Sequence, residues 1–141
     1  ALDQPIHVVL GPQADYFTDG AVQTFLSSEY TVSPQADRMG YRLEGPALAH
    51  AKGYNIVSDG IVAGAIQVPG SGLPIVLMVD HQTTGGYPKI ATVISADIPV
   101  IGRRKPGRPL RFVAVGVHAA ELLRREQEAA IRLAVENLLA L

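Results

Sequence analysis

Short runs of apolar or alternating residues fill most of this chain, and such runs predict β-strands rather than long helices. Three of them lie in the first third of the chain, at residues 6–10, 28–32 and 41–44. Gly11-Pro12 ends the first run and Gly45-Pro46 ends the third, and both pairs favour turns. This part of the chain is therefore expected to form three strands.

The middle of the chain contains a predicted hairpin. Residues 65–68 and 75–79 are apolar runs that flank the turn-forming segment 69–73, Pro-Gly-Ser-Gly-Leu. Residues 75–79 are the most apolar run in the middle of the sequence, which indicates a buried strand. Before the hairpin, residues 47–60 form a looser connection ending in Asp59-Gly60, a favoured turn pair.

Beyond the hairpin, the pattern is less regular. Residues 90–94 favour a strand, with a short helical turn as the alternative. Residues 99–109 begin and end with proline and include several basic side chains, so they predict a loop, and residues 110–117 predict a final strand. The basic run at 103–108 is typical of a solvated turn, with docking of an acidic partner as the alternative.

Two helices are predicted. Thr18 is suited to cap a short one, because the residues after it place apolar side chains on one face: Ala21, Val22, Phe25 and Leu26. A longer helix is predicted from about residue 119 to residue 141, a stretch without glycine or proline. Its apolar stripe either covers the rest of the domain or meets another chain, and consists of Ile131, Ala134, Val135, Leu138 and Leu141.

The strand count and the turn residues together predict a mainly β domain. About seven short strands are punctuated by 14 glycines and 10 prolines, which favours a closed or nearly closed barrel. Periodicity alone does not separate a barrel from a sandwich. A length of 141 residues fits a single domain, and no linker divides it.

Composition narrows the class of protein. A net charge of −1 favours neither nucleic acid nor an anionic membrane as a partner. With no cysteine the chain has no disulfide, thiolate metal site or cysteine nucleophile, which fits a cytoplasmic location. No apolar run approaches the length of a membrane span, and the first residues do not resemble a signal peptide.

Polar residues follow the central buried strand, and they form the candidate site. Gln82, Thr83 and Thr84 offer amide and hydroxyl groups that suit a urea-like or cyclic amide, which presents both N–H and C=O. Gly85-Gly86 allows backbone N–H groups to point at an anion. Ordinary turn chemistry is the alternative for each of these residues.

Lys89 is the strongest candidate in the stretch. As a cation at the mouth of the barrel it would hold a phosphate, a carboxylate or a developing oxyanion, whereas the alternative is a solvated lysine beside a proline turn. Tyr87 closes one wall of the pocket or packs beside Pro88.

Arg38 and Gln67 are the upstream candidates. An arginine fork suits a carboxylate or phosphate, although a structural ion pair of Arg38 with Glu29 or Asp37 is an equal alternative. Gln67 lies in an apolar setting, so it requires a hydrogen-bond partner if it points inward and is a plain edge residue if it points outward.

Other chemistry is disfavoured. Asp80 and His81 are neighbours whose side chains would face opposite sides of a strand, so they do not form a dyad. His7, His50 and His118 are too far apart for a metal-type spacing, and no metal site is expected. Neither a Walker loop nor a G-x-S-x-G motif occurs.

The segment Gln82–Lys89, together with Ser27–Tyr30 and Asp37–Gly40 upstream, resembles the KipA family. Its members are the C subunit of 5-oxoprolinase, allophanate hydrolase subunit 2 and the biotin-dependent carboxyltransferase domain of urea amidolyase. The similarity runs from about Leu10 to Phe112. Since family domains are about twice as long as this chain, residues 1–141 resemble the second half alone, one AHS2-like subdomain.

The resemblance implies a cyclophilin-like closed barrel, with the short helix in the N-terminal half and the long one at the C-terminus. It also implies a subunit of an ATP-dependent amidohydrolase that opens 5-oxoproline to glutamate. In that function Lys89 and Gly85-Gly86 would stabilise an oxyanion or phosphate. Gln67, Gln82 and Thr84 would orient the amide, and Arg38 would hold the carboxylate.

Partners and alternatives follow from the same resemblance. The implied partners are a KipI-like subunit, a third subunit and the companion first subdomain. One alternative is biotin-dependent carboxyl transfer to urea or a related amide. A second is a non-catalytic binding module, because some relatives antagonise a kinase inhibitor.

Overall fold

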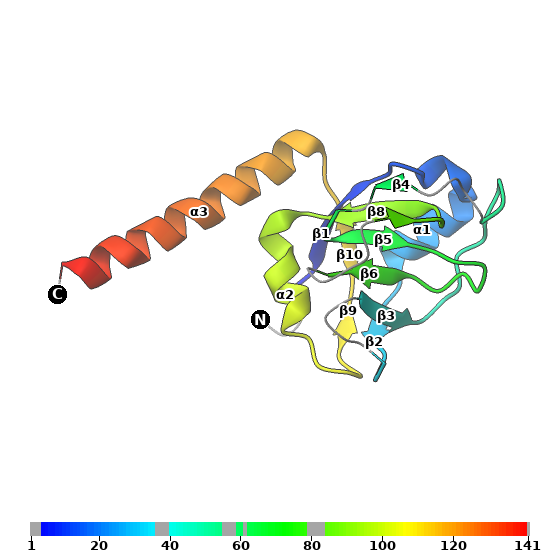
Figure 1. Cartoon of the computed structure of the whole chain (residues 1–141), viewed down its shortest axis with the longest axis horizontal. Coiled ribbons are helices and arrows are strands. Elements are labelled where there is room, and N and C mark those ends of the chain that lie inside the picture. Colours follow the sequence, from blue (N-terminus) through cyan, green and yellow to red (C-terminus); the bar gives the residue numbers. More distant parts are fainter. Residues whose placement is uncertain (1–3, 36–39, 55–58, 61, 79–83, 141) are drawn as a thin grey trace.

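A computed structural model describes residues 4–35, 40–54, 59–60, 62–78 and 84–140. Figure 1 shows a β structure with a small helix packed against it and a long C-terminal helix that projects away from it. The strands are β1 (Ile6–Leu10), β2 (Tyr30–Val32), β3 (Gly40–Glu44), β4 (Asp59–Gly60), β5 (Ala65–Gln67), β6 (Ile75–Leu77), β7 (Thr84–Gly85), β8 (Lys89–Val93), β9 (Pro109–Leu110) and β10 (Phe112–Ala114). The α-helices are α1 (Asp19–Ser27), α2 (Ile98–Gly102) and α3 (Val117–Leu139), and the 3-10 turns are η1 (Ala14–Tyr16) and η2 (Ser95–Asp97).

Eight strands form a nearly closed barrel in the order β10-β1-β8-β5-β6-β3-β2-β9. Its two outer strands come from one continuous segment. β9 pairs antiparallel with β2 and β10 pairs parallel with β1, with only Arg111 between them. This segment therefore joins the two edges of the sheet, and the prediction of a mainly β, nearly closed barrel is confirmed.

The core is packed between α1 and the closing segment. The rings of Phe25 and Phe112 stack with centroids 4.6 Å apart, and the ring of Tyr30 is tilted against both. All three side chains are fully buried. Burial raises the pKa of Tyr30 to about 12, and its hydroxyl donates a hydrogen bond to the carbonyl oxygen of Pro46 at 2.8 Å.

Helix α1 begins where its cap predicts. The hydroxyl of Thr18 accepts a hydrogen bond from the backbone N–H of Ala21 at 3.0 Å. Ala21 and Phe25 are buried, and Val22 and Leu26 are half-buried, so the predicted apolar face is confirmed.

The central hairpin and the following strand are also confirmed. β5 and β6 pair antiparallel, with Ile66 opposite Val76. Residues 89–93 form β8, a strand rather than a helical turn. The strand predicted at residues 28–32 is shorter than expected, since it begins at Tyr30 and Ser28 is still the C-cap of α1.

Three predictions were wrong. Asp59-Gly60 is not a turn but strand β4, whose backbone pairs with β7. The loop predicted at residues 99–109 begins instead as helix α2, because proline is tolerated in the first helical turn, where Pro99 lies. The final strand is interrupted at Arg111 and stops at Ala114, so Val117 already belongs to α3.

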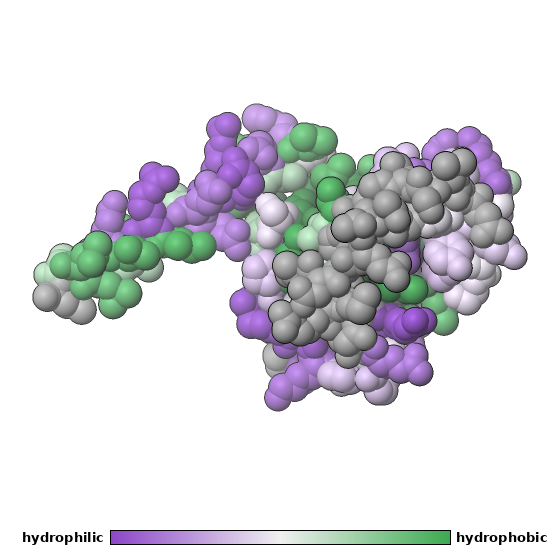
Figure 2. Space-filling model, viewed as in Figure 1, coloured by the Kyte–Doolittle hydropathy of each residue, from purple (hydrophilic) through white to green (hydrophobic). Residues whose placement is uncertain are grey.

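Helix α3 touches the barrel only near its beginning. It contacts β1 and η2, and the side-chain amide of Gln127 donates to the carbonyl oxygen of Ala96 at 3.1 Å. Every residue from 128 to 140 is exposed, including Ile131 and Leu138. Figure 2 shows apolar residues gathered at the outer end of this helix. The four described residues of the stripe, from Ile131 to Leu138, therefore do not cover the barrel. In the described part of the chain, no helix is long and apolar enough to cross a membrane.

Candidate functional site

Lys89 is the first residue of β8 and is buried, with 2% of its surface exposed. Its Nζ has no hydrogen-bond partner among the residues that the structure describes. Burying such a group without a partner is costly. The alternative of a solvated lysine is therefore wrong, and the unpaired Nζ marks a place where a ligand would find a hydrogen-bond donor.

Gln67 lies directly opposite Lys89, at the end of β5. Its Oε1 is buried and, like the Lys89 Nζ, is unpaired within the described ranges. Gln67 as a whole is half-buried, but its side-chain oxygen is shielded from solvent. The strand pairing brings one buried donor and one buried acceptor to the same part of the barrel.

A β-bulge creates this pairing. Ile66 is opposite Ala91, but the next residue, Gln67, is opposite Lys89 rather than Ile90. β8 therefore contains one extra residue at this point. A bulge re-aims the side chains that follow it, and here it places Lys89 on the face of the sheet that Gln67 occupies.

The strands that carry the pair are fastened next to it. The backbone N–H of Val68 donates to the carbonyl oxygen of Pro88 at 3.0 Å, and Nε2 of His50 donates to the carbonyl oxygen of Val68 at 2.9 Å. The His50 ring packs on the ring of Phe17, with centroids 5.0 Å apart. These contacts fasten the end of β5 to β8 and to the segment that carries His50.

The structure describes only some of the remaining predicted site residues. β7 pairs with β4, which positions the backbone of Thr84 and Gly85, while Gly86 is half-buried. Tyr87 is 37% exposed beside the buried Pro88. The other candidates, Arg38, Gln82, Thr83, Asp80 and His81, lie outside the described residues. Glu29, one partner considered for Arg38, forms an ion pair with Arg111 at 3.4 Å.

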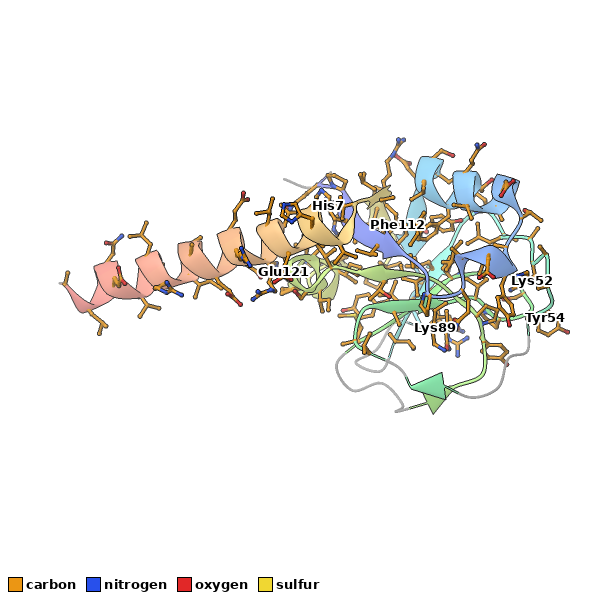
Figure 3. All side chains as sticks on the ribbon, turned by 90° about the horizontal axis from the view of Figure 1, so that it is seen from above. His7, Lys52, Tyr54, Lys89, Phe112 and Glu121 are labelled. Atoms are coloured by element: carbon orange, nitrogen blue, oxygen red, sulfur yellow. The ribbon has the colours of Figure 1, made fainter. Side chains whose placement is uncertain are left out.

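A charged pair lies at the same end of the barrel. Lys52 Nζ binds Asp15 Oδ2 at 2.8 Å, and it also lies 5.6 Å from the centre of the Tyr16 ring. The hydrogen bond from Lys52 lowers the pKa of Asp15, and the same bond raises the pKa of Lys52. Figure 3 shows Lys52, Tyr54 and Lys89 on the side of the barrel away from the projecting end of α3.

Two of the histidines hold the scaffold together. Oδ2 of the buried Asp97 accepts hydrogen bonds from the backbone N–H of His7 at 2.7 Å and from its Nδ1 at 2.8 Å, which ties β1 to η2. His50 binds Val68 as described above. Within the described ranges, no group of three or more His, Cys, Asp or Glu residues could hold a metal ion.

The basic run at 103–108 is more than a solvated turn. One guanidinium nitrogen of Arg104 donates to the carbonyl oxygen of Pro109 at 2.9 Å, and another donates to that of Gln4 at 2.8 Å. Arg104 thereby fastens the N-terminal segment to the start of β9, whereas Arg103 and Lys105 in the same run are exposed.

Comparison with known proteins decides the family. Residues 1–114 match the family described as the carboxyltransferase domain, subdomain A and B. The chain belongs to this family. The resemblance drawn from residues 10–112 is confirmed, and α3 lies beyond the matched range.

The curated relatives are longer than this chain. It is 39% identical over 123 residues to the C subunit of 5-oxoprolinase from Escherichia coli (strain K12), an alignment that covers 87% of the chain and 40% of that protein. The identity is 46% over 101 residues to the corresponding C subunit from Haemophilus influenzae, covering 72% of the chain and 33% of that protein. The chain therefore spans less than half the length of these relatives.

Solved structures support the same family. The urea amidolyase of K. lactis superimposes with a TM-score of 0.86 at 27% identity, over 92% of this chain and 8% of that one. The urea carboxylase of Kluyveromyces lactis gives the same TM-score and identity, over 92% of this chain and 12% of the other.

One residue of the site escaped the sequence pattern. Gln13, in the turn after β1, accepts a hydrogen bond from the backbone N–H of Lys89 through its side-chain oxygen at 2.9 Å. A glutamine after a Gly-Pro pair suggests only a polar turn. No sequence motif links Gln13 to Lys89, because the two residues are 76 positions apart in the chain.

Proposed function

We propose that this chain is part of the C subunit of a 5-oxoprolinase, and that Lys89 and Gln67 bind the cyclic amide of 5-oxoproline. One observation supports this function. Lys89 Nζ and Gln67 Oε1 are buried, neither has a hydrogen-bond partner in the described part of the chain, and the two residues lie directly opposite each other. The identities of 39% and 46% to two proteins named as that subunit favour this substrate over other amides.

The two groups match the two polar atoms of a lactam. A lactam carbonyl accepts a hydrogen bond and its N–H donates one, so Lys89 Nζ would donate to the oxygen and Gln67 Oε1 would accept from the nitrogen. When water adds to the carbonyl carbon, negative charge develops on the oxygen. A donor held in a buried position stabilises that charge more than it stabilises the neutral carbonyl, which lowers the barrier to ring opening.

The overall reaction adds one water across the C–N bond of the ring. The hydroxyl group stays on the carbonyl carbon, the ring nitrogen leaves as an amine that gains a proton, and the product is glutamate. In the complex, ATP hydrolysis would drive this step. The chain's own contribution is to bind and orient the amide.

The other predicted residues have proposed places around this pair. The backbone of Gly85 and Gly86 would add N–H donors for an oxyanion or phosphate, and Tyr87 would close one wall. Gln82, Thr83 and Thr84 would complete the amide contacts, and Arg38 would hold the substrate carboxylate.

Partners belong to the proposal because the chain spans 40% or less of these two relatives. A companion first subdomain, a KipI-like subunit and a third subunit would complete the complex that uses ATP. The isolated chain would then fold without turning over substrate.

Biotin-dependent carboxyl transfer to urea or a related amide is the second candidate. The observation that favours it is the superposition on urea amidolyase and urea carboxylase, with a TM-score of 0.86 for each. The same donor and acceptor would serve a urea, which also presents C=O and N–H. A binding module that antagonises a kinase inhibitor is the non-catalytic alternative.

The test is a turnover assay on the native complex. The complex is copurified from its host and assayed with 5-oxoproline and ATP, using the wild-type chain, Lys89→Met and the matched control Lys105→Met at an exposed lysine. Loss of one oxyanion donor is expected to lower kcat by roughly 100- to 1000-fold. Lys105→Met should leave kcat unchanged. Full turnover in Lys89→Met would overturn the assignment, and a copurifying biotin-carrying partner without glutamate formation would favour carboxyl transfer.

A further inference from the structure

One residue holds both backbone groups of Lys89. The backbone N–H of Gln13 donates to the carbonyl oxygen of Lys89 at 2.9 Å, and Oε1 of Gln13 accepts from the backbone N–H of Lys89 at 2.9 Å. The ammonium group of Lys89 has no such anchor in the described part of the chain. The direction of this side chain therefore depends on how its backbone is held.

The side chain of Gln13 forms a hydrogen bond to β8 beyond the point where the pairing with β1 ends. β1 pairs with β8 as far as Leu10, which lies opposite Ala91, and the N–H of Gly11 still donates to the carbonyl oxygen of Ile90 at 2.8 Å. Lys89 lies beyond this paired region. In a regular ladder a backbone carbonyl would accept its N–H, and here the amide oxygen of Gln13 does so.

The turn before Gln13 makes this possible. Gly11 has a φ of 102°, a conformation that favours glycine, and it turns the chain so that Gln13 returns alongside β8. The carbonyl oxygen of Gln13 is also used, since it accepts from the N–H of Tyr16 at 3.0 Å. Gln13 is thus held by the turn that precedes η1 while its side chain binds β8.

We propose that Gln13 is the positioning residue that keeps Lys89 aimed into the amide-binding site, an inference that rests on the proposed function of Lys89. The bulge at Ile90 leaves Lys89 opposite Gln67. Without the side-chain acceptor, the N–H of Lys89 would be unpaired, and a return to regular pairing would place Gln67 opposite Ile90. Such a slip of one residue turns a side chain to the other face of the sheet. Gln13 prevents this slip.

The first readout is the chemical reactivity of Lys89, which does not depend on turnover. The chain has three lysines, and Lys52 and Lys105 are exposed, so they serve as internal controls for reductive methylation with peptide mapping. Lys89 should be protected in the wild type. Gln13→Leu should raise its rate of methylation roughly tenfold or more, because loss of the anchor lets this segment open locally. Gln13→Glu keeps an acceptor oxygen at the same distance and should restore protection.

The second readout is turnover of the complete complex. Gln13→Leu is expected to lower kcat by roughly 10- to 100-fold, because a small displacement of a catalytic group is costly. Gln13→Glu should recover most of that loss. Gln23→Leu, the same substitution on the exposed face of α1, is the matched control and should behave as the wild type. If Gln13→Leu does not fold, Gln13→Asn, which is one methylene shorter, takes its place.

The outcomes separate the two proposals. Protection of Lys89 that is unchanged in Gln13→Leu overturns the positioning inference, whatever happens to turnover. Increased reactivity that is reversed by Gln13→Glu supports it. If Lys89→Met keeps full turnover, the proposed function fails, while the methylation experiment still decides whether Gln13 positions Lys89.

Discussion

Gln67 and Lys89 lie opposite each other on β5 and β8, and each buries a polar atom that has no partner among the described residues. Such groups destabilise a folded chain unless something binds to them. In the proposed function, the bound amide would supply the hydrogen-bond partners that these two opposed atoms lack.

The first prediction is that the buried, unpaired Lys89 Nζ lowers the free energy of unfolding of the chain. Lys89→Met removes a buried unpaired group and keeps an unbranched side chain of similar length, so the free energy of unfolding should rise by about 1–3 kcal/mol. Urea unfolding of the chain measures this change, with Lys105→Met as the control that should leave stability unaltered. A decrease in stability would mean that Lys89 is paired in the folded chain.

The second prediction concerns the closing segment. Phe112→Ala removes a buried ring stacked on Phe25 and should cost about 3–5 kcal/mol of stability. Val113→Ala, on the neighbouring and partly exposed residue, should cost less than about 1 kcal/mol. Thermal or urea unfolding of both variants is the measurement. Equal losses would show that β10 is not the element that completes the core.

The third prediction is that the ion pair of Asp15 and Lys52 makes the stability of the chain depend on pH. The pKa of Asp15 is lowered by Lys52, so this carboxylate contributes stability above its unfolded pKa of 3.8 and loses it as the pH falls through the lower folded value. The pKa of Lys52 is raised, so its contribution is complete below 10.5 and is lost as the pH rises through the folded value. Because the pair is exposed, both effects are small and sensitive to salt.

Nuclear magnetic resonance titration of the Asp15 carboxyl carbon tests this pair. In Lys52→Met the pKa of Asp15 should return toward 3.8, whereas Lys105→Met should leave it lowered. An Asp15 pKa that is the same in the wild type and in Lys52→Met would show that the ion pair does not form in solution.

The fourth prediction concerns the outer half of α3. Ile131 is 57% exposed and lies beyond Gln127, whose side chain bonds to the barrel. Ile131→Asp should therefore change the free energy of unfolding by less than about 0.5 kcal/mol. Urea unfolding at two protein concentrations measures it. A large loss that depends on concentration would show that the stripe meets another chain, the alternative that the sequence left open.

Local sequence was sufficient for the elements whose signals are local. The cap at Thr18, the hairpin around residues 69–73 and the glycine- and proline-free C-terminal helix were all predicted, because each depends on residues within a few positions of one another. The family resemblance also implies roles for Lys89 and Gln67. Their buried, opposed placement is the physical reason to assign both to one site.

Only the tertiary structure decided which strands meet and in what register. Asp59-Gly60 forms a strand because β7 lies beside it, and Pro99 lies in the first turn of helix α2, where the composition predicted a loop. The bulge that turns Lys89 toward Gln67, and the hydrogen bonds of Gln13 to Lys89 across 76 positions, depend on pairing between distant segments. Side-chain periodicity specifies which face of a strand is apolar but not which partner strand it pairs with. The sequence by itself therefore determined most of the elements and the candidate chemistry, whereas strand pairing in the nearly closed barrel decided which candidate residues lie opposite each other.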